Sequence, residues 1–111
     1  MITDLTYLNN MTDGNPELIQ EMINIFTSQV DEYIVEMNSL YDLQNWNGLS
    51  RLAHKAKSSV AIMGMTNLAE MLKEFEINAK DHLHIEKYPE YIYRFTKDCI
   101  TACEELNNLT L

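Results

Sequence analysis

The stretch that decides the fold is residues 51–64, RLAHKAKSSVAIMG, because its apolar residues recur at the spacing of one helix face. The apolar positions of this stripe are Leu49, Leu52, Ala53, Ala56, Val60 and Met63. A second face carries polar, cationic and small residues, namely Ser50, Arg51, His54, Lys57, Ser58 and Ala61. The pattern predicts an amphipathic helix over residues 46–63 that presents the imidazole of His54 to solvent, with cationic and hydroxyl neighbours one turn away and no bulky side chain to shield it.

Outward from this helix, the same periodicity predicts three more long helices and one short one. A short helix is expected over residues 4–11 and a long one over residues 16–43. The apolar stripe of the long helix is Leu18, Met22, Ile25, Phe26, Gln29, Val30, Tyr33, Met37, Leu40 and Tyr41. A third helix ends near residue 80, and a last one has Pro89 in its first turn. The fold class predicted is therefore all-α, an antiparallel four-helix bundle with an additional short N-terminal helix.

Helix-start and helix-stop residues support these boundaries. Asn15 followed by Pro16 is a strong helix start, and Asn45 is suited to cap the helix that carries His54. Thr3 is expected to cap the first helix, and Asn67 with Glu70 resembles a capping box. Gly64 suits the left-handed residue that follows a helix end. Met65, just beyond it, is expected to flank a docking surface.

Length and composition set limits on the class of protein. The 111 residues predict one domain, 1–111, with a single modest core. A net charge of −9 argues against nucleic acid and against anionic membranes as partners. No apolar run approaches a membrane span, and the N-terminal residues do not resemble a signal peptide. We therefore expect a cytoplasmic protein with no membrane insertion, acting as a monomer.

The two cysteines, Cys99 and Cys103, lie one helical turn apart, where a disulfide does not form comfortably. They are interpreted as buried thiols of a reducing compartment. Together with His82 and His84 they match no common zinc spacing, so no metal site is expected.

Charge placement singles out His54. No Lys or Arg precedes Arg51, and no Asp or Glu lies between Asp42 and Glu70. Arg51, Lys55 and Lys57, called the basic cluster below, therefore form a local positive region on an acidic chain. A lone helical histidine is most often just a solvated residue, but this setting suits an anion such as a phosphoryl group on His54.

The stretch resembles the signature of histidine-containing phosphotransfer (HPt) domains. The residues that carry the resemblance are Ala53 and His54, Lys57 three residues after the histidine, Ser59 five after it and Gly64 ten after it. The family usually reads Ala-His-x-Leu-Lys-Gly-Ser, and the flanking helices also match in order and length. Two positions depart from it: Ala56 replaces a common Leu, and Ser58 replaces a common Gly, which puts a side chain where the family leaves room for a partner.

The resemblance implies a phosphorelay protein. His54 would accept a phosphoryl group from the aspartyl phosphate of one receiver domain, on a response regulator or a hybrid sensor kinase, and pass it to another. Lys57 would offset phosphoryl charge, Ser58 or Ser59 would orient the group, and Arg51 and Lys55 would add longer-range attraction. Ala61 and Gly64 would belong to the docking surface. No cofactor is expected on this chain, and the Mg²⁺ would be held by the receiver.

Other classes of protein remain open from the sequence. The three glycines are isolated and form no phosphate-binding loop, so a kinase is not expected. A kinase dimerisation domain is also not favoured, because such domains usually follow the histidine with an acid, whereas Lys55 follows here. One alternative is a non-catalytic helical interaction module whose basic cluster docks an acidic partner. Another, with least support, is an enzyme that uses a histidine nucleophile.

Overall fold

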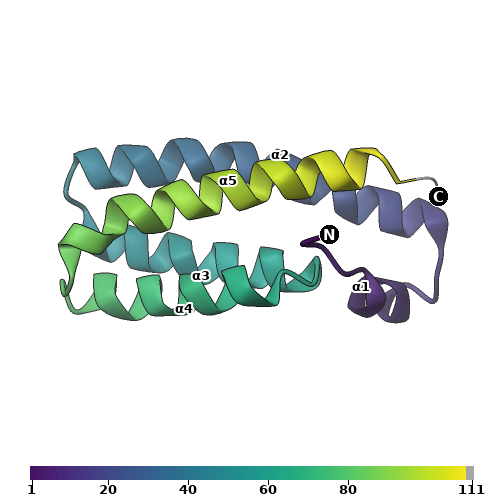
Figure 1. The fold of residues 1–111 in the computed structure, drawn as a ribbon, viewed down its shortest axis with the longest axis horizontal. Helices are drawn as coiled ribbons and strands as arrows, with labels where there is room; N and C mark the ends of the chain where they lie inside the picture. The colour runs from purple at the N-terminus through teal and green to yellow at the C-terminus, as the bar shows by residue number, and fades with distance from the viewer. Residues whose placement is uncertain (110–111) are drawn as a thin grey trace.

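The computed structural model describes residues 1–109, which form helices joined by short connections, with no strand in that part of the chain (Figure 1). The helices are α1 (Thr6–Met11), α2 (Pro16–Asp42), α3 (Trp46–Ile62), α4 (Thr66–Lys80) and α5 (Tyr88–Asn107), with a 3₁₀ turn, η1 (Ile85–Lys87), before α5. Thr110 and Leu111, at the end of the predicted 1–111 domain, lie outside the described residues. The all-α class, the antiparallel four-helix bundle and the additional N-terminal helix are confirmed.

The bundle is an elongated rod with extents of 42 × 20 × 20 Å. Helices α2 and α5 run along one side of it, and the α3–α4 hairpin runs along the other (Figure 1). Helix α2 is the longest at 27 residues, and its first turns extend past the end of the α3–α4 hairpin. Helix α1 lies beside this extension, beyond the last turn of α3, so the short helix closes one end of the bundle.

The core agrees with the predicted stripes, except in the first half of α2. All six stripe residues of the α3 segment are buried, between 0 and 3% exposed. On α2, however, Leu18 and Ile25 are 45% and 48% exposed, while Ile19 and Ile23 are buried. This half of α2 extends past the α3–α4 hairpin and lies beside α1, so its buried face is turned relative to the half that packs on α3. A single continuous stripe was therefore the wrong expectation here.

Two of the predicted helix starts are confirmed and two are wrong. The side chain of Asn15 accepts hydrogen bonds from the backbone N–H groups of Glu17 and Leu18, and that of Asn45 accepts one from Gly48. The capping box at Asn67 is wrong, because α4 already begins at Thr66 with Met65 at the N-cap. Met65 is 3% exposed, so it anchors the turn in the core and does not flank a docking surface.

Thr3 does not cap the first helix. The Oδ1 atom of Asp4 accepts from the backbone N–H and the hydroxyl of Thr6 at 2.9 and 2.7 Å, and so organises the start of α1. Thr3 is instead 8% exposed, and its hydroxyl donates to Oε1 of Glu105 on α5 at 2.7 Å. Residues 1–5, called the N-terminal strap below, thus run from α5 across the end of the bundle to α1.

Gly64 fits its place for two separate reasons. Its φ of +74° is the left-handed conformation expected after the end of α3. In addition, a Cβ atom at this position would lie only 2.2 Å from the backbone oxygen of Asp4, so no side chain fits under the N-terminal strap. The backbone N–H of Asp4 donates to the carbonyl of Met63 at 2.9 Å, which holds the strap on the turn between α3 and α4.

Aromatic side chains fill the opposite end of the bundle. The Trp46 ring packs against Tyr41 and Tyr88, with ring centroids 5.8 and 5.4 Å apart. The Tyr88 hydroxyl donates to the carbonyl oxygens of Leu83 at 2.6 Å and Asn78 at 3.0 Å. These bonds hold the connection between α4 and α5, where His82 and His84 lie exposed.

The cysteines are free thiols on α5, with Cys99 buried and Cys103 half-buried. Burial raises the pKa of the Cys99 thiol well above its usual range, which makes it unreactive. Within residues 1–109, no group of three or more His, Cys, Asp or Glu side chains is placed to hold a metal ion. No helix in this range combines the length and the apolar character that crossing a membrane requires.

Candidate functional site

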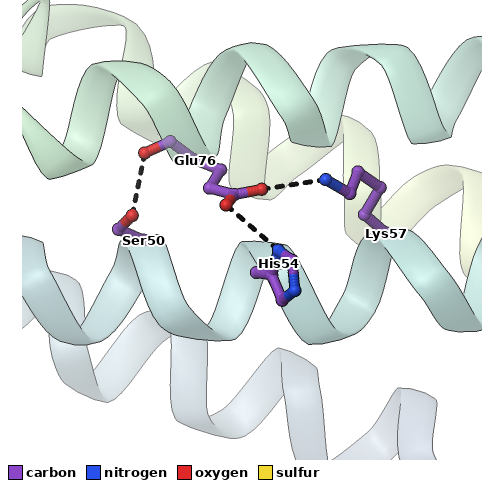
Figure 2. Close-up of polar contacts among 4 residues, drawn as sticks. All are labelled: Ser50, His54, Lys57 and Glu76. Atoms are coloured by element: carbon purple, nitrogen blue, oxygen red, sulfur yellow. Dashed lines mark hydrogen bonds and ion pairs between the residues drawn. The ribbon is translucent and has the colours of Figure 1, made fainter.

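His54 projects from the middle of α3 with its side chain 62% exposed. Its ring is held on one side only. The Nδ1 atom lies 3.0 Å from Oε2 of Glu76, which comes from the facing helix α4 (Figure 2). An ionised carboxylate can only accept a hydrogen bond, so Nδ1 carries the proton and donates. A ring that carries its single proton on Nδ1 keeps the lone pair of Nε2 free.

Glu76 joins His54 to Lys57. Its other carboxylate oxygen, Oε1, accepts from the ammonium group of Lys57 at 3.1 Å, so one carboxylate bridges two residues that lie one turn apart on α3 (Figure 2). The side chains of Lys57 and Glu76 are 28% and 26% exposed, so this pair is only partly screened by water. The lysine of the predicted site is thus already paired in the resting protein.

Ser50 fixes the backbone beneath this carboxylate. Its hydroxyl donates to the carbonyl oxygen of Glu76 at 2.8 Å (Figure 2). Although the sequence places Ser50 on the His54 face, it is only 8% exposed, because α4 covers this edge of α3. Ser50, His54 and Lys57 therefore all bond to a single residue of α4.

The charges around Glu76 favour its ionised form. Partial burial opposes ionisation of this carboxyl group. The hydrogen bond from Lys57, the positive charge of Lys57 and the contact with His54 outweigh that effect and hold the pKa of Glu76 below its usual value of 4.5. The carboxylate is therefore charged, and acts as an acceptor for His54, at neutral pH.

The basic cluster is divided between two environments. Lys57 faces α4 and is paired with Glu76. Arg51 and Lys55 face the α2 side of α3, are both exposed, and form no ion pair with any side chain in residues 1–109. They line a small recess with Glu36 of α2 but stay outside ion-pair distance of its carboxylate. Two of the three predicted cations are thus available to an anionic partner.

The remaining predicted site residues lie in two different places. Ser59 faces α2, where its hydroxyl donates to Oε1 of Gln29 at 3.0 Å and lies 3.3 Å from the hydroxyl of Tyr33. It is therefore occupied away from the imidazole. Ser58, Ala61 and Gly64 instead line a groove of about 780 Å³ between the end of α3 and α1, called the α1–α3 groove below.

Glu76 is the residue that sequence reasoning missed. Along α3 itself His54 has no acidic neighbour, because no Asp or Glu lies between Asp42 and Glu70. The usable signal is the tight turn around Met65, because His54 lies eleven residues before it and Glu76 eleven residues after it. In an antiparallel hairpin of two helices, residues at equal distances from the turn face each other. Equal spacing from the turn at Gly64 and Met65 therefore predicts that Glu76 faces His54.

Comparison with known families gives one match. The family model described as "Hpt domain" matches residues 21–108, which is most of the chain. The chain therefore belongs to the Hpt domain family. Searches of the curated proteins and of the solved structures gave no significant match. Hpt domains are phosphotransfer modules of two-component signalling; they carry a phosphoryl group and interact with receiver domains in phosphorelays.

Proposed function

We propose that this chain accepts a phosphoryl group on Nε2 of His54 from the aspartyl phosphate of one receiver domain and passes it to an aspartate of another. The observation that carries the proposal is the contact between Nδ1 of His54 and Glu76, because it leaves Nε2 as the exposed, unprotonated nitrogen. The family membership and the exposure of the imidazole support the same role.

The step conserves atoms and charge. The lone pair of Nε2 attacks phosphorus, the N–P bond forms, and the bond between phosphorus and the aspartyl oxygen breaks, so the aspartate leaves as a carboxylate. The ring keeps its proton on Nδ1 and becomes cationic, and the carboxylate of Glu76, 3.0 Å away, stabilises that charge. Return of the phosphoryl group to a second aspartate reverses each change.

Lys57 serves the product state. In the resting protein its ammonium group is bound to Oε1 of Glu76. When the phosphoryl group arrives, Lys57 moves to a phosphoryl oxygen, while Glu76 keeps its bond to the cationic ring. Arg51 and Lys55, which lack ion-pair partners in residues 1–109, attract the acidic receiver over a longer range. This chain then needs no cofactor of its own, and the Mg²⁺ belongs to the receiver.

The test is transfer of radiolabel from a phosphorylated receiver domain to the wild-type protein and to a His54→Gln variant. Acid-labile label on the wild type and none on the variant supports the proposal. Binding of the receiver without label would favour the alternative, a helical interaction module that docks an acidic partner through the basic cluster. Turnover of a small phosphate ester would instead indicate an enzyme with a histidine nucleophile.

A further inference from the structure

The α1–α3 groove lies next to the proposed site along the same helix. Ser58 and Ala61 line it from the exposed face of α3, and Tyr7 lines it from α1. At 1.5 Å per residue, Ser58 is about 6 Å and Ala61 about 10 Å along the helix from His54. The groove is therefore within the immediate surroundings of the imidazole.

A receiver domain that reaches His54 must also cover this groove. A standard protein interface buries about 800 Å² on each partner, which corresponds to a disc of about 16 Å radius. Centred on His54, such a disc includes the whole α3 side of the groove. The groove and the site thus share one docking surface, and its occupant is the receiver surface that borders the phosphorylated aspartate. Tyr7, Ala61 and Ile62 give the groove apolar walls, so the matching receiver surface presents apolar side chains there.

The two walls of the groove differ in origin. The α3 wall lies within residues 21–108, the part of the chain that matches the Hpt family model. The opposite wall comes from the N-terminal strap and α1, within residues 1–20, which lie outside the match. The part of the chain that matches the family supplies the histidine and the transfer chemistry. The wall outside the match adds contacts to the docking surface that the matched part does not provide.

Glu105 holds that second wall in place from α5. Its carboxylate accepts from the backbone N–H of Ile2 at 2.9 Å, from that of Thr3 at 3.1 Å, and from the Thr3 hydroxyl at 2.7 Å. The strap then continues to Asp4, whose side chain accepts from the backbone N–H of Thr6 at the start of α1. The buried side chain of Leu8 fixes α1 to the core, while Glu105 sets the path of the chain that leads into it.

We propose that the α1–α3 groove selects which receiver domain reaches His54, and that Glu105 is a positioning residue for this selection because it holds the N-terminal strap. The proposal rests on the function proposed above and adds to it the surface that discriminates between receivers. It assigns the discriminating role to residues outside the family match and separates it from the chemistry at His54.

The first test compares two exposed tyrosines. Tyr7 lies in the groove and is 57% exposed, whereas Tyr93 on α5 is 68% exposed and lines a different surface, between α2 and α5. Tyr7→Ala should raise the KM for the preferred receiver about fivefold or more, as loss of an aromatic interface contact does, and should change the ratio of kcat/KM between two receivers. Tyr93→Ala should change neither. Equal behaviour of the two variants would overturn the proposal.

Phosphoramidate, a small phosphoryl donor that releases ammonia when it phosphorylates histidine, separates docking from chemistry. Because it needs no docking surface, labelling of His54 by phosphoramidate should be the same in the wild type, Tyr7→Ala and Tyr93→Ala. If the wild type takes label from phosphoramidate but from no receiver, the proposed function fails. The dissociation constants of unphosphorylated receivers then still test the groove, and a Tyr7→Ala variant with unchanged affinities and preference overturns its role.

The second test concerns Glu105. Glu105→Ala removes every hydrogen bond from the strap to α5, leaves the bond from the Asp4 N–H to the Met63 carbonyl in place, and should raise the receiver KM in the same direction as Tyr7→Ala, with phosphoramidate labelling unchanged. Thr3→Ser keeps the hydroxyl, so its receiver KM should match that of the wild type. Thr3→Val loses one of the strap hydrogen bonds, so its receiver KM should lie between those of the wild type and Glu105→Ala. Hydrogen exchange at Ile2 and Thr3, whose backbone N–H groups donate to Glu105, reports whether the strap is released. Released strap amides with an unchanged receiver KM and an unchanged preference, in protein that remains folded in thermal melts, would show that Glu105 is structural only.

Discussion

The two sides of His54 are built differently. On the α4 side, Ser50, His54 and Lys57 all bond to Glu76, at distances of 2.8 to 3.1 Å. On the α2 side, Arg51 and Lys55 are exposed and have no ion-pair partner in residues 1–109. The first side is organised before any partner arrives, which suits chemistry. The second side leaves its charges in water, which suits attraction and recognition of an acidic partner.

The largest effect should come from His54 itself, where the two sides meet. His54→Gln should abolish acceptance of the phosphoryl group, because the amide offers no comparable nucleophile. Since the side chain is 62% exposed, the free energy of unfolding should change by no more than about 0.5 kcal/mol. Label transfer and thermal melts measure the two quantities. His82→Gln is the control and should accept label like the wild type. Label on the His54→Gln variant would show that the phosphorylated residue is not on α3.

Next in size is the loss of the carboxylate on the α4 side. Glu76→Ala removes the hydrogen bond that keeps the proton on Nδ1 and the charge that stabilises the cationic ring. A hydrogen bond to a charged group contributes about 1.5–3 kcal/mol, so transfer at saturating receiver should slow by about tenfold to a hundredfold. The control is Glu70→Ala, which removes an exposed acid from the same helix. Nitrogen-15 NMR of the wild type should show the Nδ1-protonated tautomer; the opposite tautomer would contradict the assignment of Nε2.

Replacing the cations on the α4 side and on the α2 side of His54 should affect different steps of the transfer. Lys57→Ala should lower the transfer rate at saturating receiver, because this residue acts on the bound phosphoryl group. The double variant Arg51→Ala with Lys55→Ala should leave that rate unchanged. It should instead weaken association about threefold to tenfold at low salt, an effect that disappears as salt screens the charges. Lys97→Ala, an exposed lysine on α5, is the control. If association with the receiver had the same salt dependence in all the variants, the two sides of His54 would not differ in role.

The smallest effect concerns stability against pH. The pKa of Glu76 is lower in the folded protein than its usual value of 4.5, because Lys57 and His54 outweigh the cost of partial burial. A lowered folded pKa gives stability that is present above pH 4.5 and is lost as the pH falls through the folded pKa. Wild type should therefore exceed Glu76→Gln in stability by at most about 0.5 kcal/mol near neutral pH, and the difference should vanish in acid. Melts between pH 3 and pH 7 decide this; a difference that grows in acid would reverse the sign.

Sequence reasoning reached most of the fold and one side of the site. The periodicity of α3, α4 and α5 was sufficient, because each of these helices has one stripe facing one core. It failed on the first half of α2, where Leu18 and Ile25 are exposed because the helix passes from one set of neighbours to another. The place of His54, exposed and flanked by cations, follows from spacing within a single helix.

Contacts between helices were beyond that reasoning. The pairing of Lys57 with Glu76 depends on how α4 packs on α3, and so do the burial of Ser50 and the distance from Nδ1 to a carboxylate. The strap was missed for a similar reason, since Thr3 and Glu105 lie 102 residues apart in the chain. Local patterns predict what a helix presents, but a partner on another element requires the topology of the hairpin or the bundle.

The packing of Trp46 gives this protein a built-in optical probe. Trp46 is the one tryptophan of the chain, and it sits among Tyr41 and Tyr88 at the end of the bundle away from α1. From there to His54 the helix runs about 12 Å, which is less than the radius of about 16 Å of the surface that a docked receiver covers. Its emission will therefore follow global unfolding and will also change when a receiver docks at His54. The last turn of α3 is about 24 Å from Trp46, so an extrinsic dye near the α1–α3 groove is needed to follow the groove separately.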